Sequence, residues 1–241
     1  MGEQRKYQGF VVAAIIAGVL ASCSGSHSGS DSGSRSDSGA GSGSRAKAGL
    51  GSASGPDSDA GSHGPLSVGR VARMAAGPGA TCPVRYDMAA AAKAAAVGKR
   101  VRAGTVNGET ADRRQPGAPL TLSKGALVSC GYRIGQERAR LFTVGVRKGA
   151  ALDVLLPQIQ HDAGMTMTEL KGYAARASRG RASEAPGDPL LTPSGNVASV
   201  RLPAEGKGDL ALVVSLGEER TALTKAQVTD LTRQLADQAH G

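Results

Sequence analysis

The sequence has few aromatic residues and few histidines. Its 241 residues include no tryptophan, two phenylalanines, four tyrosines and four histidines. The core must therefore be built from Val, Leu, Ile, Met and Ala, and no aromatic platform is present on which nucleic-acid bases could stack. Only His161 lies inside a segment with regular periodicity, and a Ser/His/Asp triad needs a histidine held in folded structure. We therefore expect no enzyme of this kind and no cofactor.

Long apolar runs are also missing, apart from one near the N-terminus. Residues 9–20, GFVVAAIIAGVL, follow a short segment that carries Arg5 and Lys6. The run is shorter than the roughly 20 apolar residues that a membrane-spanning helix needs. With its basic flank it has the layout of a secretory signal peptide. We therefore predict that residues 1–22 are a signal peptide and that the rest of the chain is exported.

Cys23 follows the apolar run in the order Leu20-Ala21-Ser22-Cys23. This tetrapeptide resembles the lipobox of bacterial lipoprotein precursors, whose cysteine is acylated and becomes the mature N-terminus. Two or more acyl chains on one residue anchor a protein stably. We therefore predict a lipoprotein that reaches the membrane through lipid on Cys23, on the extracytoplasmic face of the cell membrane. The alternative is an ordinary cleaved signal peptide with an incidental cysteine.

Two further cysteines, Cys82 and Cys130, remain in the chain. Outside the cytoplasm the environment favours a disulfide between them. Closing a loop of this length stabilises a domain by about 4 kcal/mol on the chain-entropy argument. The alternative is two separate buried thiols. We expect no metal site, because neither cysteine has a second Cys or a His at ligand spacing.

Composition divides the mature chain in two. Residues 24–64 are mostly Ser and Gly and cannot bury enough apolar surface to offset the entropy of ordering. Such a coil has an end-to-end distance of roughly 35 Å. We predict that residues 23–64 are a lipidated cysteine with a disordered tether, and that residues 65–241 are a single extracytoplasmic domain.

Three helices and four strands are expected in that domain. The helices are residues 87–97 with Gly98 as the C′ residue, residues 151–164 with a kink or late start at Pro157, and a last helix after a capping box of Thr224 and Gln227. Period-2 alternation predicts strands at residues 127–134 and 140–147. Residues 196–202 and 209–216 are expected to form another pair of strands. Residues 99–124 contain turn signals and are expected to form a long loop or a weak hairpin, and the polar residues 176–195 are expected to separate the second helix from the second pair of strands.

These elements predict an α+β fold, with an antiparallel sheet of two β-hairpins and about three helices packed on one face. Several features together resemble small extracytoplasmic lipoproteins of actinobacteria that are grouped as domains of unknown function. The features are the lipobox, the Ser/Gly tether, Cys82 before an Ala-rich helix, Cys130-Gly131-Tyr132 on a strand, and the final capped helix. At Tyr132 that family more often has Trp. The resemblance covers residues 81–236, implies a surface location and a structural disulfide, and supplies no catalytic residues.

The formal net charge is +9, so an anionic partner is a candidate. Basic residues cluster at Lys99-Arg100-Arg102, Arg113-Arg114, Arg138/Arg140 and Arg176/Arg179/Arg181. Export argues against nucleic acid as the partner and points instead to lipid headgroups or phosphate-bearing wall polymers. The alternative is that these basic residues only contact solvent and bind no partner.

Three hypotheses of function follow. The first is a membrane-anchored binding module at the cell envelope, whose partner is an envelope protein or an anionic wall polymer. The second is a carrier or sensor of a small apolar ligand or lipid, which needs an apolar pocket. The third is an enzyme of unrecognised type, which needs His161 buried beside a carboxylate and a hydroxyl.

Overall fold

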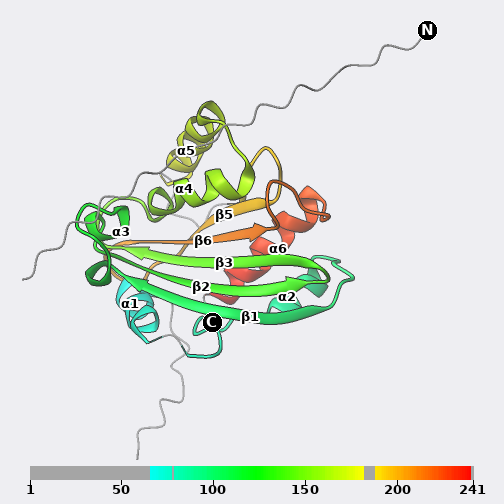
Figure 1. Cartoon of the computed structure of the whole chain (residues 1–241), viewed down its shortest axis with the longest axis horizontal. Coiled ribbons are helices and arrows are strands. Elements are labelled where there is room, and N and C mark those ends of the chain that lie inside the picture. The colour runs from blue at the N-terminus through cyan, green and yellow to red at the C-terminus, as the bar shows by residue number, and fades with distance from the viewer. Residues whose placement is uncertain (1–65, 78, 182–187, 240–241) are drawn as a thin grey trace, which may run out of the picture. The chain divides into compact units, whose positions relative to one another are not determined.

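The computed structural model describes residues 66–77, 79–181 and 188–239 (Figure 1). These residues belong to one compact unit, Asp57–Gly241. The predicted signal peptide, the lipidated Cys23 and the tether lie outside the described residues, so they stay predictions.

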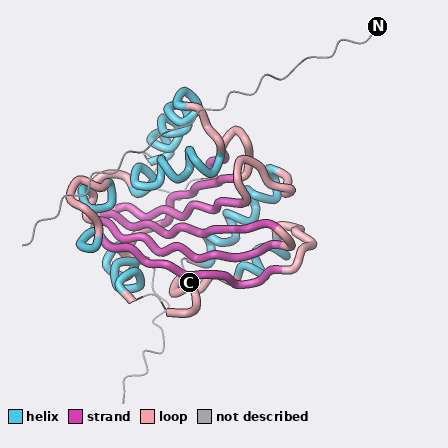
Figure 2. The backbone as a smooth tube through the Cα atoms, viewed as in Figure 1, coloured by secondary structure: helices cyan, strands magenta, loops and turns pink. Residues whose placement is uncertain are grey.

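A six-stranded antiparallel sheet forms the centre of the described part (Figure 2). Its strands are β1 (Val101–Thr110), β2 (Gly125–Ile134), β3 (Glu137–Val146), β4 (Leu190–Leu191), β5 (Val197–Leu202) and β6 (Asp209–Leu216), in the order β1-β2-β3-β6-β5-β4. Each half of the chain supplies three adjacent strands, and the halves meet where β3 pairs with β6. The two predicted hairpins are present as β2–β3 and β5–β6, and β1 and β4 extend the sheet beyond them.

Six α-helices accompany the sheet in the described ranges. They are α1 (Val68–Ala76), α2 (Met88–Ala94), α3 (Pro119–Leu122), α4 (Ala151–Ala163), α5 (Met167–Arg181) and α6 (Lys225–Gln238), with a 3-10 turn η1 at Ala111–Arg113. Helices α1, α2 and α6 pack on one face, and α4 and α5 lie over the other (Figure 1). The α+β class is confirmed, whereas the prediction of about three helices on one face is wrong.

The sheet is covered on both sides because its central strands are apolar on both sides. Leu141 and Val214 face the core under α1, α2 and α6, while Phe142 and Val213 face the core under α4 and α5. All eight residues of β6 are buried. A continuous apolar run is typical of a strand that is buried on both faces.

Strand β1 corrects the expectation of a long loop or weak hairpin over residues 99–124, because its residues pair with β2. Its sequence has low β-propensity, and it is ordered by pairing with β2 along its length, with an irregularity between Ala103 and Val106. The Asn107-Gly108 pair lies inside the strand instead of making a turn. A Cβ atom on Gly108 would lie 2.8 Å from the Ala75 Cα. Glycine at this position therefore lets α1 approach the edge of the sheet closely.

Helix α2 begins as predicted but ends early. The Asp87 carboxylate caps it by accepting a hydrogen bond of 2.8 Å from the Ala90 backbone N–H. The helix ends at Ala94, and Ala96, at φ +54°, takes the left-handed position expected for Gly98. The Val97 N–H then donates to the Ala92 carbonyl at 2.8 Å, which closes the helix end in the Schellman manner.

Helix α4 runs through Pro157 and does not begin late. The Asp209 carboxylate accepts a hydrogen bond of 2.8 Å from the Ala151 N–H, which fixes the first turn. The bond that proline cannot donate would have gone to the carbonyl of Asp153, and Asp153 and Pro157 are both exposed. Because that side of the helix faces water, the helix continues past the proline to Gly164, at φ +59°.

The last helix forms as predicted. Thr224 and Gln227 make the reciprocal capping box at the start of α6. Val228, Leu231 and Leu235 lie on its packed side and have no exposed surface. This face completes the core beneath β5 and β6.

Candidate anion-binding site

The predicted disulfide is present. Cys82 and Cys130 are joined, with their Cα atoms 5.6 Å apart. Cys130 is buried on β2, and Cys82 lies in the segment before α2. The bond therefore attaches that segment to the sheet, which is a structural role. Cys23 lies outside the described residues.

His161 and Asp162 are adjacent on α4 but differ in environment. His161 is exposed. The Asp162 carboxylate is buried and accepts hydrogen bonds from Arg140, Gln158 and Ser215 at 2.8, 2.7 and 2.6 Å. The Asp162 carboxylate is therefore occupied by hydrogen bonds from within the domain. The enzyme hypothesis needed His161 buried beside a carboxylate and a hydroxyl, and His161 is not buried. Among the described residues no group of three His, Cys, Asp or Glu side chains could hold a metal ion.

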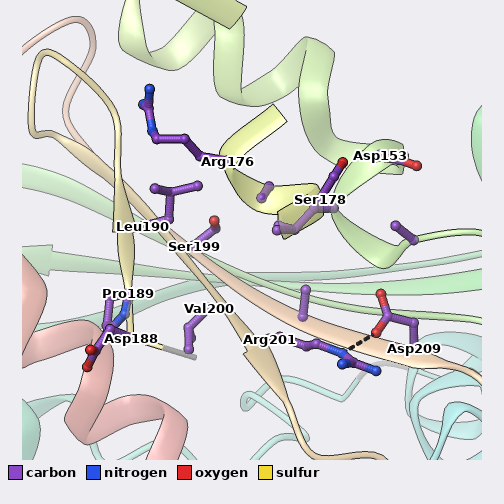
Figure 3. Close-up of a pocket in the computed structure, with 14 residues that line it drawn as sticks. Asp153, Arg176, Ser178, Asp188, Pro189, Leu190, Ser199, Val200, Arg201 and Asp209 are labelled. Atoms are coloured by element: carbon purple, nitrogen blue, oxygen red, sulfur yellow. Dashed lines mark hydrogen bonds and ion pairs between the residues drawn. The ribbon is translucent and has the colours of Figure 1, made fainter. Parts of the chain in front are cut away.

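A pocket of about 310 Å³ lies between α4, α5 and strands β4 to β6 (Figure 3). Figure 3 shows Leu190 and Ser199 directed into it, with Arg176 on the side opposite the Arg201–Asp209 pair. The Ser199 hydroxyl accepts a hydrogen bond of 2.6 Å from Tyr173. Asp209 is bonded to Arg201 at 2.7 Å while it also caps α4. Ser199, Arg201 and Asp209 therefore already have hydrogen-bond partners within the domain.

The same face of the sheet carries a row of arginines over β1, β2 and β3. Arg102 pairs directly with Arg133, and Arg133 pairs directly with Arg138. Directly paired residues point to the same side of a sheet. On β2 and β3 the residues next to Arg133 and Arg138, Ile134 and Ala139, belong to the opposite core, so the arginine row lies on the side of α4 and α5.

The arginine row is exposed and uncompensated. All three side chains are exposed, and within the part of the chain that the structure describes none of them makes an ion pair or a side-chain hydrogen bond. Helices α4 and α5 pack on β3, β5 and β6 and not over the row. Like charges directly opposite each other destabilise a sheet. The row is therefore an arrangement that folding alone does not favour.

Arg140 lies two residues after Arg138 on β3, on the same face of the sheet, and other residues hold it in place. Its guanidinium bonds to Asp162 at 2.8 Å and lies 5.6 Å from the centre of the Phe142 ring. Its side chain remains 41% exposed, so part of the guanidinium faces solvent. A guanidinium has five donors, and the bond to Asp162 leaves others for a ligand.

A hollow of about 670 Å³ lies beside the row; its lining includes Arg133, Arg138 and Arg140, and we call it the basic hollow. Gly104, Gly131 and Gly217 contribute backbone to its lining. A Cβ on Gly131 would come within 3.1 Å of the Thr105 carbonyl oxygen, so a side chain there would crowd β1. Glu218, an exposed residue, is the acidic residue in the lining. Arginines beside exposed glycine backbone make a surface suited to an anion.

A second hollow of about 700 Å³ continues from the basic hollow along the same face, and we call it the polar groove. Both hollows include Arg140 in their linings. The polar groove has hydrogen-bonding groups from Asn107, Ser129 and Gln158, set beside apolar surface. That apolar surface comes mainly from Leu120, Leu127, Phe142, Val154, Leu155 and Pro157. At its far end Arg114 is paired with Glu109. The two hollows together form one long open surface.

The sequence located part of this site. Arg102 and Arg138/Arg140 were placed in separate basic clusters, and Arg133 belonged to no cluster. Their common row could not be foreseen, because residues 99–124 were not expected to pair with β2. One signal was available: alternation placed Ser129, Gly131 and Arg133 together on the side of the strand away from Cys130. Of the other clusters, Lys99 pairs with Glu137 at 3.6 Å.

Comparison with known proteins gives no relative: no protein-family model, no curated protein and no solved structure matches this chain. No helix in the described ranges is both long and apolar enough to span a bilayer.

Proposed function

We propose that this protein is a lipid-anchored extracytoplasmic lipoprotein that acts as a binding module at the cell envelope. Cys23 is the anchor, residues 24–64 are the tether, and the open face of β1, β2 and β3 is the binding surface. The proposal assigns no catalysis to the domain. Its ligand is anionic and is held by the arginine row and Arg140.

The observation that carries the proposal is the register of Arg102, Arg133 and Arg138. Three cations in direct cross-strand pairs, with no acidic partner among the described residues, oppose folding. They become favourable when an anion binds across them, because hydrogen bonds between charged partners are stronger than neutral ones. A surface that only had to be soluble would gain more from mixed charges.

Anchoring and face binding can be tested separately. Cys23→Ala removes the acylation site and should abolish acyl labelling and release the protein from membranes. Persistent labelling would overturn the anchor. The released Cys23→Ala protein should still sediment with purified cell walls, because its binding face is intact.

The arginine row is then tested in the Cys23→Ala background. Replacement of Arg102, Arg133 and Arg138 by Gln should abolish sedimentation with the walls. The control replaces three exposed lysines elsewhere, Lys148, Lys171 and Lys207, by Gln and so lowers the net charge equally. Equal sedimentation of the two triple variants would show that net charge, and not this face, holds the protein.

A second candidate function is a carrier or sensor of a small apolar ligand. The pocket between α4, α5 and β4 to β6 favours it, because about 310 Å³ lies within the size range of small-molecule sites and Leu152, Leu190 and Ala211 line it. Native mass spectrometry of the exported protein should then find a ligand of constant mass. Ala211→Leu should displace that ligand by filling the pocket, without affecting sedimentation with walls.

A further inference from the structure

The charge of the basic hollow restricts the ligand that it can hold. Arg140 is compensated by Asp162. Arg133 and Arg138 share the lining of the hollow with one acid, the exposed Glu218, and Arg102 is paired directly with Arg133. A ligand with one negative charge would leave most of this repulsion in place. The surface therefore fits a ligand that brings several negative charges within a short distance.

The geometry favours phosphate over carboxylate. Adjacent strands lie about 4.8 Å apart, so the three side chains of the row start from neighbouring strands and can reach one ligand group from different sides. A carboxylate holds its two oxygens in one plane and is matched by one guanidinium fork. A phosphate group holds its oxygens tetrahedrally and can accept from guanidiniums that approach from different strands.

The shape of the surface favours a chain over a compact molecule. The basic hollow and the polar groove meet at Arg140 and continue each other along β1 to β3. In the polar groove Asn107 and Ser129 offer hydrogen-bonding groups beside apolar surface from Leu127 and Pro157. Polyol or sugar units, which have hydroxyl groups and apolar C–H faces, match this mixed surface. A bare acyl chain matches it less well, because it would leave the hydrogen-bonding groups of Asn107, Ser129 and Gln158 without partners.

We infer that the open face binds a linear, phosphate-bearing polyol or sugar polymer of the envelope, with phosphates on the arginine row and the polyol units in the polar groove. This inference rests on the proposed function and names the ligand of the same site. Arg140, fixed by Asp162 and Phe142, sits at the junction and contacts the phosphate nearest the polar groove. Glu218 at the rim disfavours phosphates outside the row.

The test is direct binding by isothermal titration calorimetry with the soluble Cys23→Ala protein. The probe is a synthetic glycerol phosphate oligomer, compared with a polyglutamate of the same charge. The oligomer should bind more tightly than polyglutamate, and its affinity should fall with rising salt. Arg133→Gln with Arg138→Gln should weaken oligomer binding by roughly tenfold to a hundredfold. Lys171→Gln with Lys207→Gln, the matched control, should leave it unchanged.

The polar groove makes its own contribution. Asn107→Ala with Ser129→Ala should weaken binding of the oligomer severalfold and leave binding of inorganic phosphate unchanged, because phosphate alone does not reach that groove. A circular dichroism spectrum and an unfolding midpoint like those of the parent show that the variants remain folded. Equal loss for both probes would overturn the placement of the polyol units.

Other outcomes separate this inference from the proposed function. Equal affinity for polyglutamate would overturn the phosphate assignment, and binding only to vesicles with phosphatidylglycerol would replace the polymer with a membrane surface. No binding of the oligomer, with wall sedimentation still dependent on the arginine row, would overturn the ligand and leave the binding module intact. Sedimentation with walls that does not depend on the arginine row would overturn both the proposed binding face and the proposed ligand.

Discussion

The buried carboxylate of Asp162 at the end of α4 holds the guanidinium of Arg140 on β3 at 2.8 Å. The backbone of Asp162 also takes part, since its carbonyl accepts hydrogen bonds from the Asn196 side chain at 2.8 Å and the Glu219 N–H at 2.7 Å. One residue thus joins α4, the central strands and the segment after β6. It also fixes the arginine at which the two hollows of the open face meet.

Asp162→Asn should lower the free energy of unfolding by about 2 kcal/mol, because one side of a buried, charge-assisted network is lost. The cost stays below that of a fully buried pair, since Arg140 is 41% exposed and keeps contact with water. Urea unfolding measures the change. Asp153→Asn, at an exposed position of the same helix, is the control and should change stability little. An unchanged midpoint for Asp162→Asn would contradict the network.

Arg133→Thr should raise the free energy of unfolding by about 0.5 kcal/mol at low salt. The substitution removes the charge that faces Arg102 on one side and Arg138 on the other, and threonine favours strands. The gain should shrink at high salt, because exposed charges are screened. Thermal unfolding at two salt concentrations gives the result. A loss of stability at low salt would mean that Arg133 supports the fold.

Ala96→Gly should stabilise the protein by about 1 kcal/mol, because Ala96 holds φ at +54° and glycine adopts that conformation without strain. Ala94→Gly, two residues earlier on the exposed side of α2, should destabilise it by about 1 kcal/mol as an ordinary helix substitution. Urea unfolding of the two variants should therefore give changes of opposite sign. Changes of the same sign would show that the end of α2 is placed wrongly.

Stability should fall in alkaline solution partly through Tyr173. Burial raises the pKa of this phenol to about 12, against a smaller opposing effect of the Ser199 hydroxyl. Because the folded state favours the neutral phenol, this contribution is complete below pH 10, the ordinary pKa of tyrosine, and is lost as pH rises toward 12. Tyr173→Phe should therefore lose less stability over that interval, by about 2 kcal/mol. Parallel losses in both proteins would contradict the burial of an ionisable phenol.

Elements with strong local signals were predictable from the sequence. The capping box of Thr224 and Gln227 and the alternating residues of β2 and β3 depend on neighbours in the chain. The run over residues 209–216 also carried a signal for cover on both faces, because it is apolar without alternation. That signal would have corrected the expectation of helices on one side.

Other elements depend on distant contacts. Strand β1 contains Asn107-Gly108, which predicts a turn in isolation, and only pairing with β2 makes it a strand. Helix α5 had an unused signal, since Thr166 and Glu169 cap it reciprocally. Local alternation indicated which face of its strand Arg133 takes, but no local signal joins the arginines into a row, because they come from three strands.

The disulfide closes a covalent ring that contains the whole of β1. Cys82 and Cys130 lie 48 positions apart, and both ends of the intervening chain are attached to the same sheet. Domain swapping needs a segment that can leave its own molecule and pair with another copy. A strand inside a closed ring has no free end, so exchanging it would require the whole ring to move. Oxidation therefore opposes the loss of the edge strand, and of Arg102 with it, to another copy.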